Sequence, residues 1–202
     1  MIGHYNSSQK LLLVGEGDFS FSACLAMAFG SAVNMVATSL LSRDEVLLRH
    51  PDSYYNLKLL RSLGCLILHR VDVCSMNKHQ VLKSLGFDVI IYNFPHAGHF
   101  RGLKETNARM IRKNQQLLKG YFASAKCLVK MGGEVHVTHR DDMPYKNWEV
   151  KMLAEKVGFI FIEKVEFNLK DYPSYQIKRG GDIRGDDTFS ISHSFTFKFY
   201  YV

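Results

Sequence analysis

The chain of 202 residues contains no apolar run that approaches the roughly 20 residues needed to cross a bilayer. Its four cysteines lie far apart without a C-x-x-C pair, which argues against a disulfide framework and a zinc knuckle. It has no internal repeat, and Met1 to Lys10 is polar without the apolar centre of a signal peptide. We therefore expect a soluble intracellular protein with reduced, mostly buried thiols and a flexible segment at residues 1–10.

The length and a hydrophobic content of 47% fit one α/β domain, residues 1–202, with a large core. The net charge of +7 is uneven: residues 1–100 carry 8 Lys and Arg against 7 Asp and Glu, whereas residues 101–202 carry 18 against 12. A basic half favours a polyanion such as RNA as a partner, although such clusters are often ordinary solvated surface.

The order of strand-like and helical patterns predicts the fold class. Strands are expected at 11–14, 34–39, 65–71, 88–93, 133–138, 159–167 and 192–201. The first five alternate with helical patterns, which predicts a largely parallel sheet with helices on both faces. A long helix should run from Leu103 to Val129 and end at Gly132-Gly133, and another should start at Asn147 as its N-cap. The last two strands follow with only a long loop, 170–189, between them. We expect a seven-stranded, mostly parallel sheet with an antiparallel final strand.

The segment LLLVGEGDFSFS, Leu11 to Ser22, indicates a buried strand, a glycine turn and a helix start. Gly15 and Gly17 remove side chains where a ligand must approach the backbone, and free N–H groups at a helix start favour polar or anionic groups. A nicotinamide-dinucleotide fold would want a third glycine at position 20, where Ser20 stands. This difference favours S-adenosylmethionine, with an ordinary strand-to-helix turn as the alternative.

In an open α/β sheet, ligands bind beyond the carboxyl ends of the strands. The first turn should hold the amino-acid part of S-adenosylmethionine, the end of the second strand its ribose, and the acid after the third strand its adenine amino group. The expected donor-binding residues are Gly15, Glu16, Gly17, Phe19, Ser20, Thr38, Ser39, Asp72, Val73 and Asn93. For Asp72, a turn or cap aspartate is the alternative interpretation.

Asn93-Phe94-Pro95-His96 closes the fourth strand and resembles the Asn/Asp-Pro-Pro-aromatic tetrapeptide of many amino- and ring-nitrogen methyltransferases. An amide oxygen and a backbone carbonyl at a strand end can accept the N–H bonds of a target nitrogen and orient its lone pair. We expect Asn93, Pro95 and His96 to hold the target base. For an imide such as uracil N3, a base must also remove the proton, and histidine, here His96, is a side-chain type suited to that role near neutral pH. A loop hydrogen bond is the other interpretation of His96.

Two histidine pairs, His96 with His99 and His136 with His139, invite a metal hypothesis. Positions i and i+3 of a strand point to opposite faces, so the second pair does not converge on one ion. The first pair lacks a third ligand nearby. We therefore expect no metal.

The late loop is the expected RNA-binding segment. Its basic and aromatic residues are Tyr172, Tyr175, Lys178, Arg179 and Arg184. Lysine and arginine neutralise phosphates, and tyrosine stacks on exposed bases. A second basic group lies by the long helix, at Arg101, Lys104, Arg109, Arg112 and Lys113, for which a solvated helix face is the preferred interpretation.

Several blocks of the chain are similar to the domain of the eukaryotic ribosomal-RNA uridine-N3 methyltransferase and its plant and animal relatives. They are GEGDFSFS (15–22), ATS (37–39), NFPHAG (93–98), GEVHVTH (133–139), DYPSY (171–175) and KRG (178–180), in the family's order and across nearly the whole chain. The resemblance implies a class I Rossmann-like fold, S-adenosylmethionine as donor and N3 of a uridine in large-subunit ribosomal RNA as acceptor. It also implies a nuclear or nucleolar location if ribosomal RNA is the substrate, and otherwise a cytoplasmic one. Plant members often carry a heavy-metal-associated-protein-like label, for which no C-x-x-C loop is present.

The chain departs from this family at two positions. Leu41 stands where the family tends to carry an acid suited to the ribose hydroxyls, and Asp44 or Glu45 could compensate. Ser174 replaces the usual glycine of the Asp-Tyr-Pro-Gly-Tyr block. Leu41 keeps open a second hypothesis, a non-catalytic RNA- or protein-binding module with a degenerate methyltransferase fold. A small-molecule methyltransferase is a third, which leaves the basic half without a use. The oligomeric state does not follow from the sequence.

Overall fold

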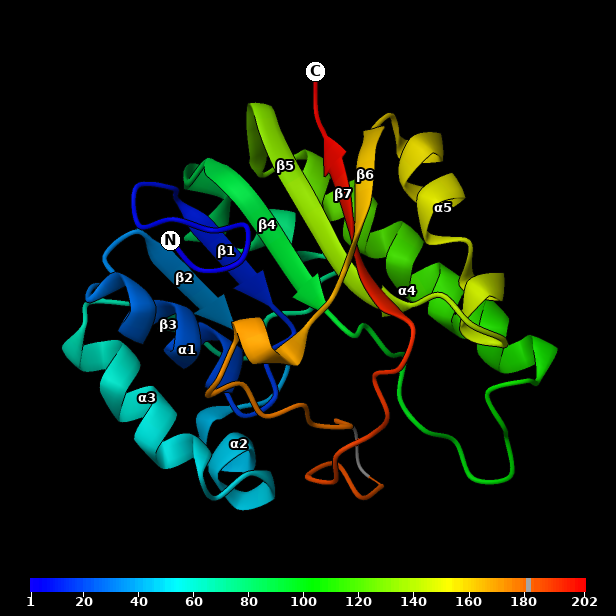
Figure 1. Ribbon diagram of the computed structural model, residues 1–202, viewed down its shortest axis with the longest axis horizontal. Coiled ribbons are helices and arrows are strands. Elements are labelled where there is room, and N and C mark those ends of the chain that lie inside the picture. The colour runs from blue at the N-terminus through cyan, green and yellow to red at the C-terminus, as the bar shows by residue number, and fades with distance from the viewer. Residues whose placement is uncertain (181–182) are drawn as a thin grey trace.

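A computed structural model describes residues 1–180 and 183–202 of the chain (Figure 1). Its strands form one seven-stranded sheet in the order β3-β2-β1-β4-β5-β7-β6. They are β1 (Leu11–Val14), β2 (Met35–Thr38), β3 (Leu66–Leu68), β4 (Phe87–Asn93), β5 (Val129–Arg140), β6 (Ile160–Glu166) and β7 (Ser194–Tyr200). The neighbouring pairs are parallel except those that β7 makes with β5 and β6. The mostly parallel sheet with an antiparallel final strand is therefore confirmed.

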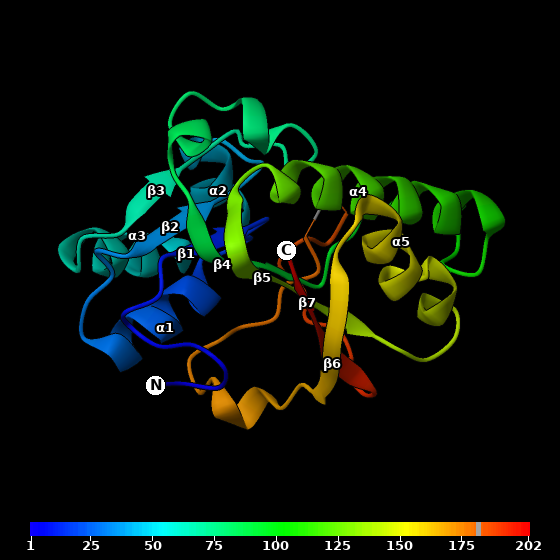
Figure 2. The ribbon, with the colours of Figure 1, turned by 90° about the horizontal axis from the view of Figure 1, so that it is seen from above.

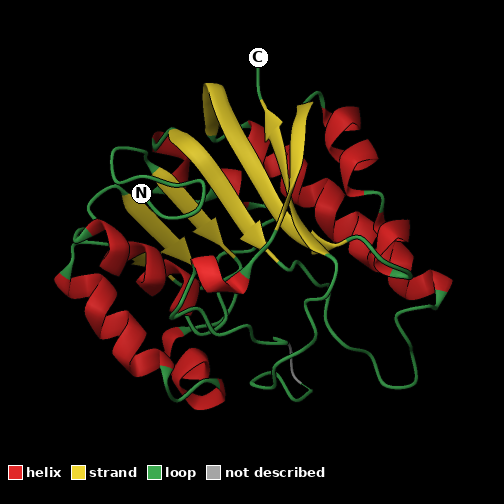
Figure 3. Cartoon of the chain, in the orientation of Figure 1, coloured by secondary structure: helices red, strands yellow, loops and turns green. Residues whose placement is uncertain are grey.

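Helices cover both faces of this sheet (Figures 2 and 3). The α-helices are α1 (Ser20–Phe29), α2 (Arg43–Arg49), α3 (Ser53–Ser62), α4 (Ala108–Lys126) and α5 (Val150–Val157). Along β1, Leu12 and Val14 belong to the core cluster on the side of α4 and α5, whereas Leu11 and Leu13 belong to the cluster on the side of α1 and α3. Because successive side chains of a strand point to opposite faces, a strand covered on both sides is apolar throughout.

The long fourth helix is shorter than the sequence predicts at both ends. It starts after Asn107, whose side-chain oxygen accepts a hydrogen bond from the backbone N–H of Arg109 at 2.8 Å and so caps the helix. It ends at Lys126, and Gly132-Gly133 lies inside β5. A Cβ at Gly133 would meet the Asp88 carbonyl oxygen at 3.0 Å, beside an irregularity in the β4–β5 register. Gly133 therefore lies in a crowded part of the strand, Gly132 beside it has a left-handed backbone with φ 71°, and the assignment of this pair to a helix end was wrong.

Two other helical predictions were wrong. The segment between β3 and β4 forms the short 3₁₀ helices Met76–Lys78 and Leu82–Ser84 in place of an α-helix. Asn147 lies within the 3₁₀ helix Tyr145–Trp148, and α5 begins after Glu149, whose backbone is left-handed with φ 56°. The exposed Asn147 side chain lies two positions before the N-cap residue, Glu149, and does not cap α5.

The first ten residues, expected to be flexible, pack against the sheet. Tyr5 is 1% exposed, and its hydroxyl lies 3.2 Å from Nδ1 of the buried His136. The backbone N–H of Lys10 donates to the Asp88 carboxylate at 2.7 Å.

Of the free cysteines, Cys24 and Cys65 are buried, while Cys74 and Cys127 are exposed, so only half of the thiols are core thiols. No helix in the described ranges is both long and apolar enough to cross a membrane.

Candidate active site

A cleft of about 390 Å³ lies at the carboxyl ends of the parallel strands. Figure 1 shows the late loop passing over these ends. The predicted donor and target residues that line the cleft are Gly15, Glu16, Gly17, Ser39, Asp72, Val73, Asn93 and His96, and the late loop adds Tyr175, Lys178 and Arg179. Strand ends that are distant in sequence meet here because parallel strands share one carboxyl edge.

Three predicted donor residues are buried beside the cleft and do not line it. Phe19 is 0% exposed and has a left-handed backbone, with φ 62°. Ser20 donates from Oγ to the Asp18 carboxylate at 2.7 Å, and Thr38 donates from Oγ1 to the carbonyl oxygen of Leu13 at 3.2 Å. These side chains hold the shape of the turn, and the structure does not bring them to the ligand space.

The two glycines of the turn have different roles. Gly15 has φ 69°, and a Cβ there would lie 2.4 Å from the Tyr92 ring. A Cβ at Gly17 would lie 3.7 Å from His50 Nε2 and from Lys178 Cβ, an ordinary contact distance. The fold itself therefore demands glycine at position 15, whereas at position 17 the missing side chain leaves open space in the cleft.

Two carboxyl groups lie at the glycine turn. The Glu16 carboxylate accepts from the backbone N–H of Ser22 at 3.2 Å, and burial raises the pKa of Glu16 to about 7. Asp18 is 3% exposed; burial raises its pKa, and its Oδ2 has no hydrogen-bond partner among the described residues. One unmet buried acceptor, Oδ2 of Asp18, with a second carboxyl group next to it suits a ligand with cationic groups.

Among the residues that the structure describes, no nearby carboxylate takes the place of the acid that is missing at Leu41, just after β2. Leu41 packs against the core cluster of α1 and α3. The Glu45 carboxylate accepts from the backbone N–H of Ser42 at 2.8 Å and from its hydroxyl at 2.6 Å, as the capping box of α2. Neither Asp44 nor Glu45 lines the cleft. The expectation that one of them replaces the acid is therefore not met by this arrangement.

The acid after β3 and the amide at the end of β4 both face the cleft. The exposed Asp72 accepts from the backbone N–H of Cys74 at 2.9 Å, so it also makes the turn that its alternative interpretation proposed. Asn93 ends β4, and its side-chain oxygen and nitrogen are both buried without a well-formed hydrogen bond in the described part of the chain, although the Tyr175 side chain interacts with this amide. Leaving such a group unmet costs about 1–3 kcal/mol, so the amide is suited to hydrogen bonds with a ligand.

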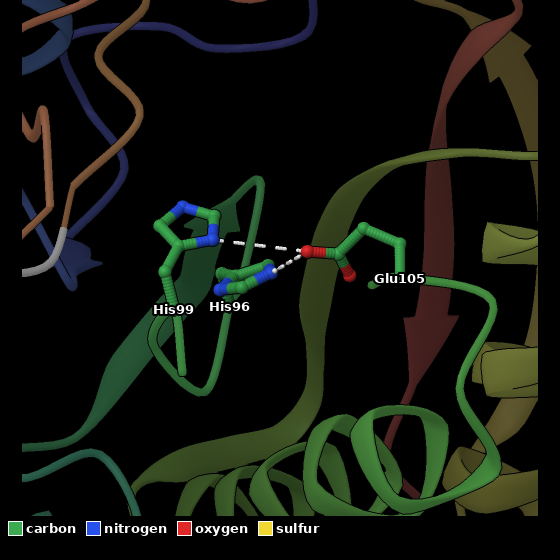
Figure 4. A group of neighbouring side chains, drawn as sticks. All are labelled: His96, His99 and Glu105. Atoms are coloured by element: carbon green, nitrogen blue, oxygen red, sulfur yellow. Dashed lines mark hydrogen bonds and ion pairs between the residues drawn. The ribbon is translucent and has the colours of Figure 1, made fainter. Parts of the chain in front are cut away.

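His96 and His99 do have an acid beside them, Glu105, which sequence reasoning missed (Figure 4). Nε2 of His96 lies 3.0 Å and Nδ1 of His99 lies 3.7 Å from Oε1 of Glu105. The hydrogen bond of His96 holds the pKa of Glu105 below its usual range. The absence of a nearby third ligand was therefore a wrong premise, because the loop after His96 turns back and brings a residue nine positions later into contact.

Two groups that can only donate hydrogen bonds determine which ring nitrogen of each histidine carries the proton. The backbone N–H of Gly98 donates to Nδ1 of His96 at 3.1 Å, and Nε of Arg179 donates to Nε2 of His99 at 2.8 Å. Each imidazole must therefore carry its proton on the nitrogen that faces Glu105. A metal would need the lone pairs on those same facing nitrogens, with the protons on the far ones. The geometry thus favours a hydrogen-bonded cluster over a metal centre, and it leaves His96 without a free lone pair to act as a base.

The late loop turns its predicted RNA-binding residues inward. Tyr172 is 3% exposed and stacks on Phe167, with ring centroids 5.5 Å apart and an interplanar angle of 9°. Its predicted role of stacking on an exposed base was wrong, because the ring completes the core. Tyr175 is half-buried at the cleft, with its ring edge-on to Phe21. Arg184 remains exposed and pairs with Asp187.

A second pocket of about 220 Å³ adjoins the cleft and shares Phe94, His96 and Arg179 with it. Its other lining residues are Pro95, His99, Glu105, His139, Arg140, Tyr145, Trp148, Thr188 and Phe189. Trp148 is 1% exposed and stacks on His139, with ring centroids 4.4 Å apart. Its Nε1 has no partner among the described residues. The sequence offered one signal for this pocket: Trp148 is the only tryptophan of the chain.

The sheet order, the antiparallel β7 and the cleft at the strand ends define a Rossmann-like class I methyltransferase fold. A methyltransferase from Pyrococcus furiosus superposes with a TM-score of 0.56 at 15% identity, covering 95% of this chain and 74% of that one. The protein SMU.776, solved in complex with S-adenosylhomocysteine, gives a TM-score of 0.54 at 13% identity, covering 96% of this chain and 46% of that one.

Residues 12–179 match the family described as BMT5-like, rRNA (uridine-N3-)-methyltransferase BTM5-like, and the chain belongs to this family. An uncharacterized Arabidopsis thaliana protein is 42% identical over 98% of this chain and 95% of its own length. Heavy metal-associated isoprenylated plant protein 41 of the same species is 43% identical, over 98% of this chain but 38% of its own length. The Saccharomyces cerevisiae 25S rRNA (uridine(2634)-N(3))-methyltransferase is 25% identical, over 87% of this chain and 67% of its own length.

Proposed function

We propose that the protein transfers a methyl group from S-adenosylmethionine to N3 of a uridine in large-subunit ribosomal RNA. The observation that carries this proposal is the family match over residues 12–179. The yeast relative, whose name states this activity, supports the choice of substrate. The cleft at the carboxyl ends of the strands lies where such a fold binds its ligand.

The cleft fits S-adenosylmethionine as donor, and a relative in fold was solved with its demethylated product. When bound, the donor supplies a methyl carbon made electrophilic by a sulfonium. The carboxyls of Glu16 and Asp18 suit the cationic ammonium and sulfonium groups, and Asp72 suits the adenine amino group. Gly15, Gly17, Ser39 and Val73 complete the proposed donor site.

The end of β4 is the proposed place of the target nitrogen. The side-chain amide of Asn93 can donate to a carbonyl oxygen of the base, and Pro95, which follows at the same strand end, helps to fix the orientation of the ring. Holding the two reactants in line removes much of the entropic barrier of the reaction. His96 has a positioning role in this arrangement, because both of its ring nitrogens are engaged.

RNA is the proposed partner, and the nucleolus or nucleus is the proposed location for that substrate. The net charge of +7 supports a polyanionic partner. Arg184 and the basic side chains by α4 are available for phosphates, while Lys178 and Arg179 make contacts within the loop and the cluster.

Two measurements on the purified protein test this function. Calorimetry with S-adenosylmethionine should show one donor site. Incubation with ribosomal RNA from cells lacking the gene, followed by mass analysis of nucleosides, should yield N3-methyluridine. Donor binding without a methylated nucleoside from any RNA, but with a methylated small molecule, would favour the third hypothesis instead.

One observation favours a non-catalytic binding module as the second candidate: no carboxylate of the described residues replaces the acid missing at Leu41. Such a module would bind RNA without measurable affinity for S-adenosylmethionine. The same calorimetric titration separates the two candidates.

A further inference from the structure

The cluster of His96, His99 and Glu105 contains one group with unused accepting capacity. Both imidazoles accept from obligate donors through their far nitrogens, so neither has a lone pair to offer. A carboxylate has about four lone-pair sites. On Glu105, Oε1 faces the two histidines, and Oε2 has no partner in the described ranges. Glu105 lines the pocket, and its buried Oε2 is therefore the acceptor of this cluster that remains unused.

The pocket around Glu105 has the walls of a site for a flat ring. Tyr145, Trp148, Phe94 and Phe189 line it, and it opens beside the strand end that carries Asn93. The buried Nε1–H of Trp148 supplies an unmet donor in the same pocket as the unmet acceptor. A ring with one N–H between two carbonyls matches this pair, because it offers a donor to the acid and an acceptor to the indole.

Resting on the function proposed above, we propose that the target uracil enters this pocket and that Glu105 accepts its N3–H. The N3–H bond breaks, its electron pair stays on the nitrogen, and the proton goes to a carboxylate oxygen of Glu105. N3 is then left with the pair that would form the new bond to the methyl carbon of a bound donor, while the carbon–sulfur bond breaks and its electron pair stays on the sulfur, which leaves as a neutral thioether. Trp148 donates from Nε1 to a carbonyl oxygen of the base and holds the ring in plane.

This arrangement also selects the base. Cytosine carries a lone pair at N3 in place of a hydrogen, so it would face the Glu105 carboxylate with two acceptors opposed. A site built to receive an N–H rejects an analogue that lacks it far more strongly than a purely apolar pocket does. His96 and His99 keep the carboxylate ionised, since the hydrogen bond of His96 lowers the pKa of Glu105.

The test uses Trp148, the only tryptophan, as a fluorescent reporter inside the pocket. Short single-stranded RNAs that differ only in one central base, uridine, cytidine or N3-methyluridine, are titrated into the protein saturated with S-adenosylhomocysteine. We expect uridine to bind at least ~10-fold more tightly than the other two, because only uridine offers the N3–H. In Glu105→Gln this preference should fall below ~3-fold, because an amide can donate or accept.

Glu155→Gln is the matched control, since Glu155 is an exposed acid of α5 outside the pocket. It should keep the wild-type preference. Calorimetry with S-adenosylhomocysteine and a melting curve verify that Glu105→Gln is folded and keeps the donor site. Because His139 also lines the pocket, His139→Asn is measured in parallel.

The outcomes separate this inference from the function on which it rests. If Glu105→Gln keeps the uridine preference, or if His139→Asn alone abolishes it, the role of Glu105 is refuted while the proposed methylation stands. The role is equally refuted if the wild-type protein methylates uridine yet binds the three RNAs alike. A wild-type protein that binds none of the RNAs and methylates none overturns both proposals.

Discussion

Nδ1 of His50 lies 2.7 Å from Oδ1 of Asp186, which also pairs with Nζ of Lys178 at 2.9 Å. His50 ends α2 and is 2% exposed, whereas Asp186 belongs to the late loop. One carboxylate thus ties the late loop to the opposite wall of the cleft. The loop is in this way a cover for the proposed donor site.

Breaking this contact should loosen the cover. In Asp186→Asn we expect S-adenosylhomocysteine to dissociate about 3- to 10-fold faster, because the loop loses its charged anchor over the cleft. Stopped-flow fluorescence of Trp148 measures the rate. Asp187→Asn removes the exposed pair with Arg184 and should change the rate less than twofold. Equal rates in all three proteins would contradict a covering role.

The two turn glycines should respond differently to the same substitution. Gly15→Ala forces a Cβ into the Tyr92 ring at a left-handed backbone position, so the free energy of unfolding should fall by about 2 kcal/mol or more. Gly17→Ala should cost less than about 1 kcal/mol but weaken donor binding, because its Cβ enters the cleft. Urea unfolding and calorimetry measure both quantities, and the interpretation fails if the two variants behave alike.

Burial raises the pKa of Glu16 to about 7, which makes stability depend on pH. The folded chain binds a proton that the unfolded chain has lost between about pH 4.5 and 7, so this group lowers stability as the pH rises through that window. The free energy of unfolding of Glu16→Gln, relative to that of the wild type, should therefore rise by about 1–2 kcal/mol from pH 5 to pH 8; this is less than the full shift because part of the Glu16 residue remains accessible to water.

Glu134 provides the contrast for this pH dependence, since the hydrogen bond of His136 lowers its pKa. A carboxyl group whose pKa is lower in the folded chain than in the unfolded chain stabilises the fold at neutral pH. This stabilisation is lost as the pH falls through the pKa of the folded state. Glu134→Gln should thus be less stable than the wild type at neutral pH. Chemical unfolding across the pH range tests both signs.

Restoring the acid at the end of β2 should tighten donor binding. Leu41→Asp offers a carboxylate to the ribose hydroxyls, for which we expect about 5- to 10-fold higher affinity for S-adenosylhomocysteine, with some loss of stability because Leu41 packs on the core. Leu40→Asp is the control, since Leu40 also lines the cleft but is 64% exposed. Calorimetry that finds no gain for Leu41→Asp contradicts a ribose role at this position.

Removing the amide at the end of β4 should separate binding from transfer. Asn93→Ala is expected to keep the affinity for S-adenosylhomocysteine within about threefold while losing methyl transfer by about 100-fold or more, because target alignment carries much of the acceleration. Asn77→Ala removes an amide that does not line the cleft and should leave transfer unchanged. Wild-type transfer by Asn93→Ala would show that the target-site assignment is wrong.

The sequence indicated the sheet and the place of the cleft because both depend on local patterns. Apolar runs such as Leu11–Val14 are readable as strands covered on both faces, and the glycine turn and Asn93 follow such runs directly. His136 and His139 contact different sides of β5, as a period of two requires: His136 lies beside Tyr5, and His139 stacks on Trp148.

Tertiary contacts decided what individual side chains in the loops do. Phe19, Thr38 and Tyr172 have residue types suited to ligands, but burial against neighbours distant in sequence turns them into core. The opposite holds for Glu105, which no motif distinguishes and which meets His96 only because the loop folds back.

By itself, then, the order of residues determined which segments form strands and which edge of the sheet collects their polar ends, since the periodicity of buried side chains is a local property. The tertiary structure alone decided which groups keep a free lone pair or donor. That depends on hydrogen bonds from partners such as Gly98 to His96 and from Arg179 to His99, and the latter pair lies 80 positions apart in the chain.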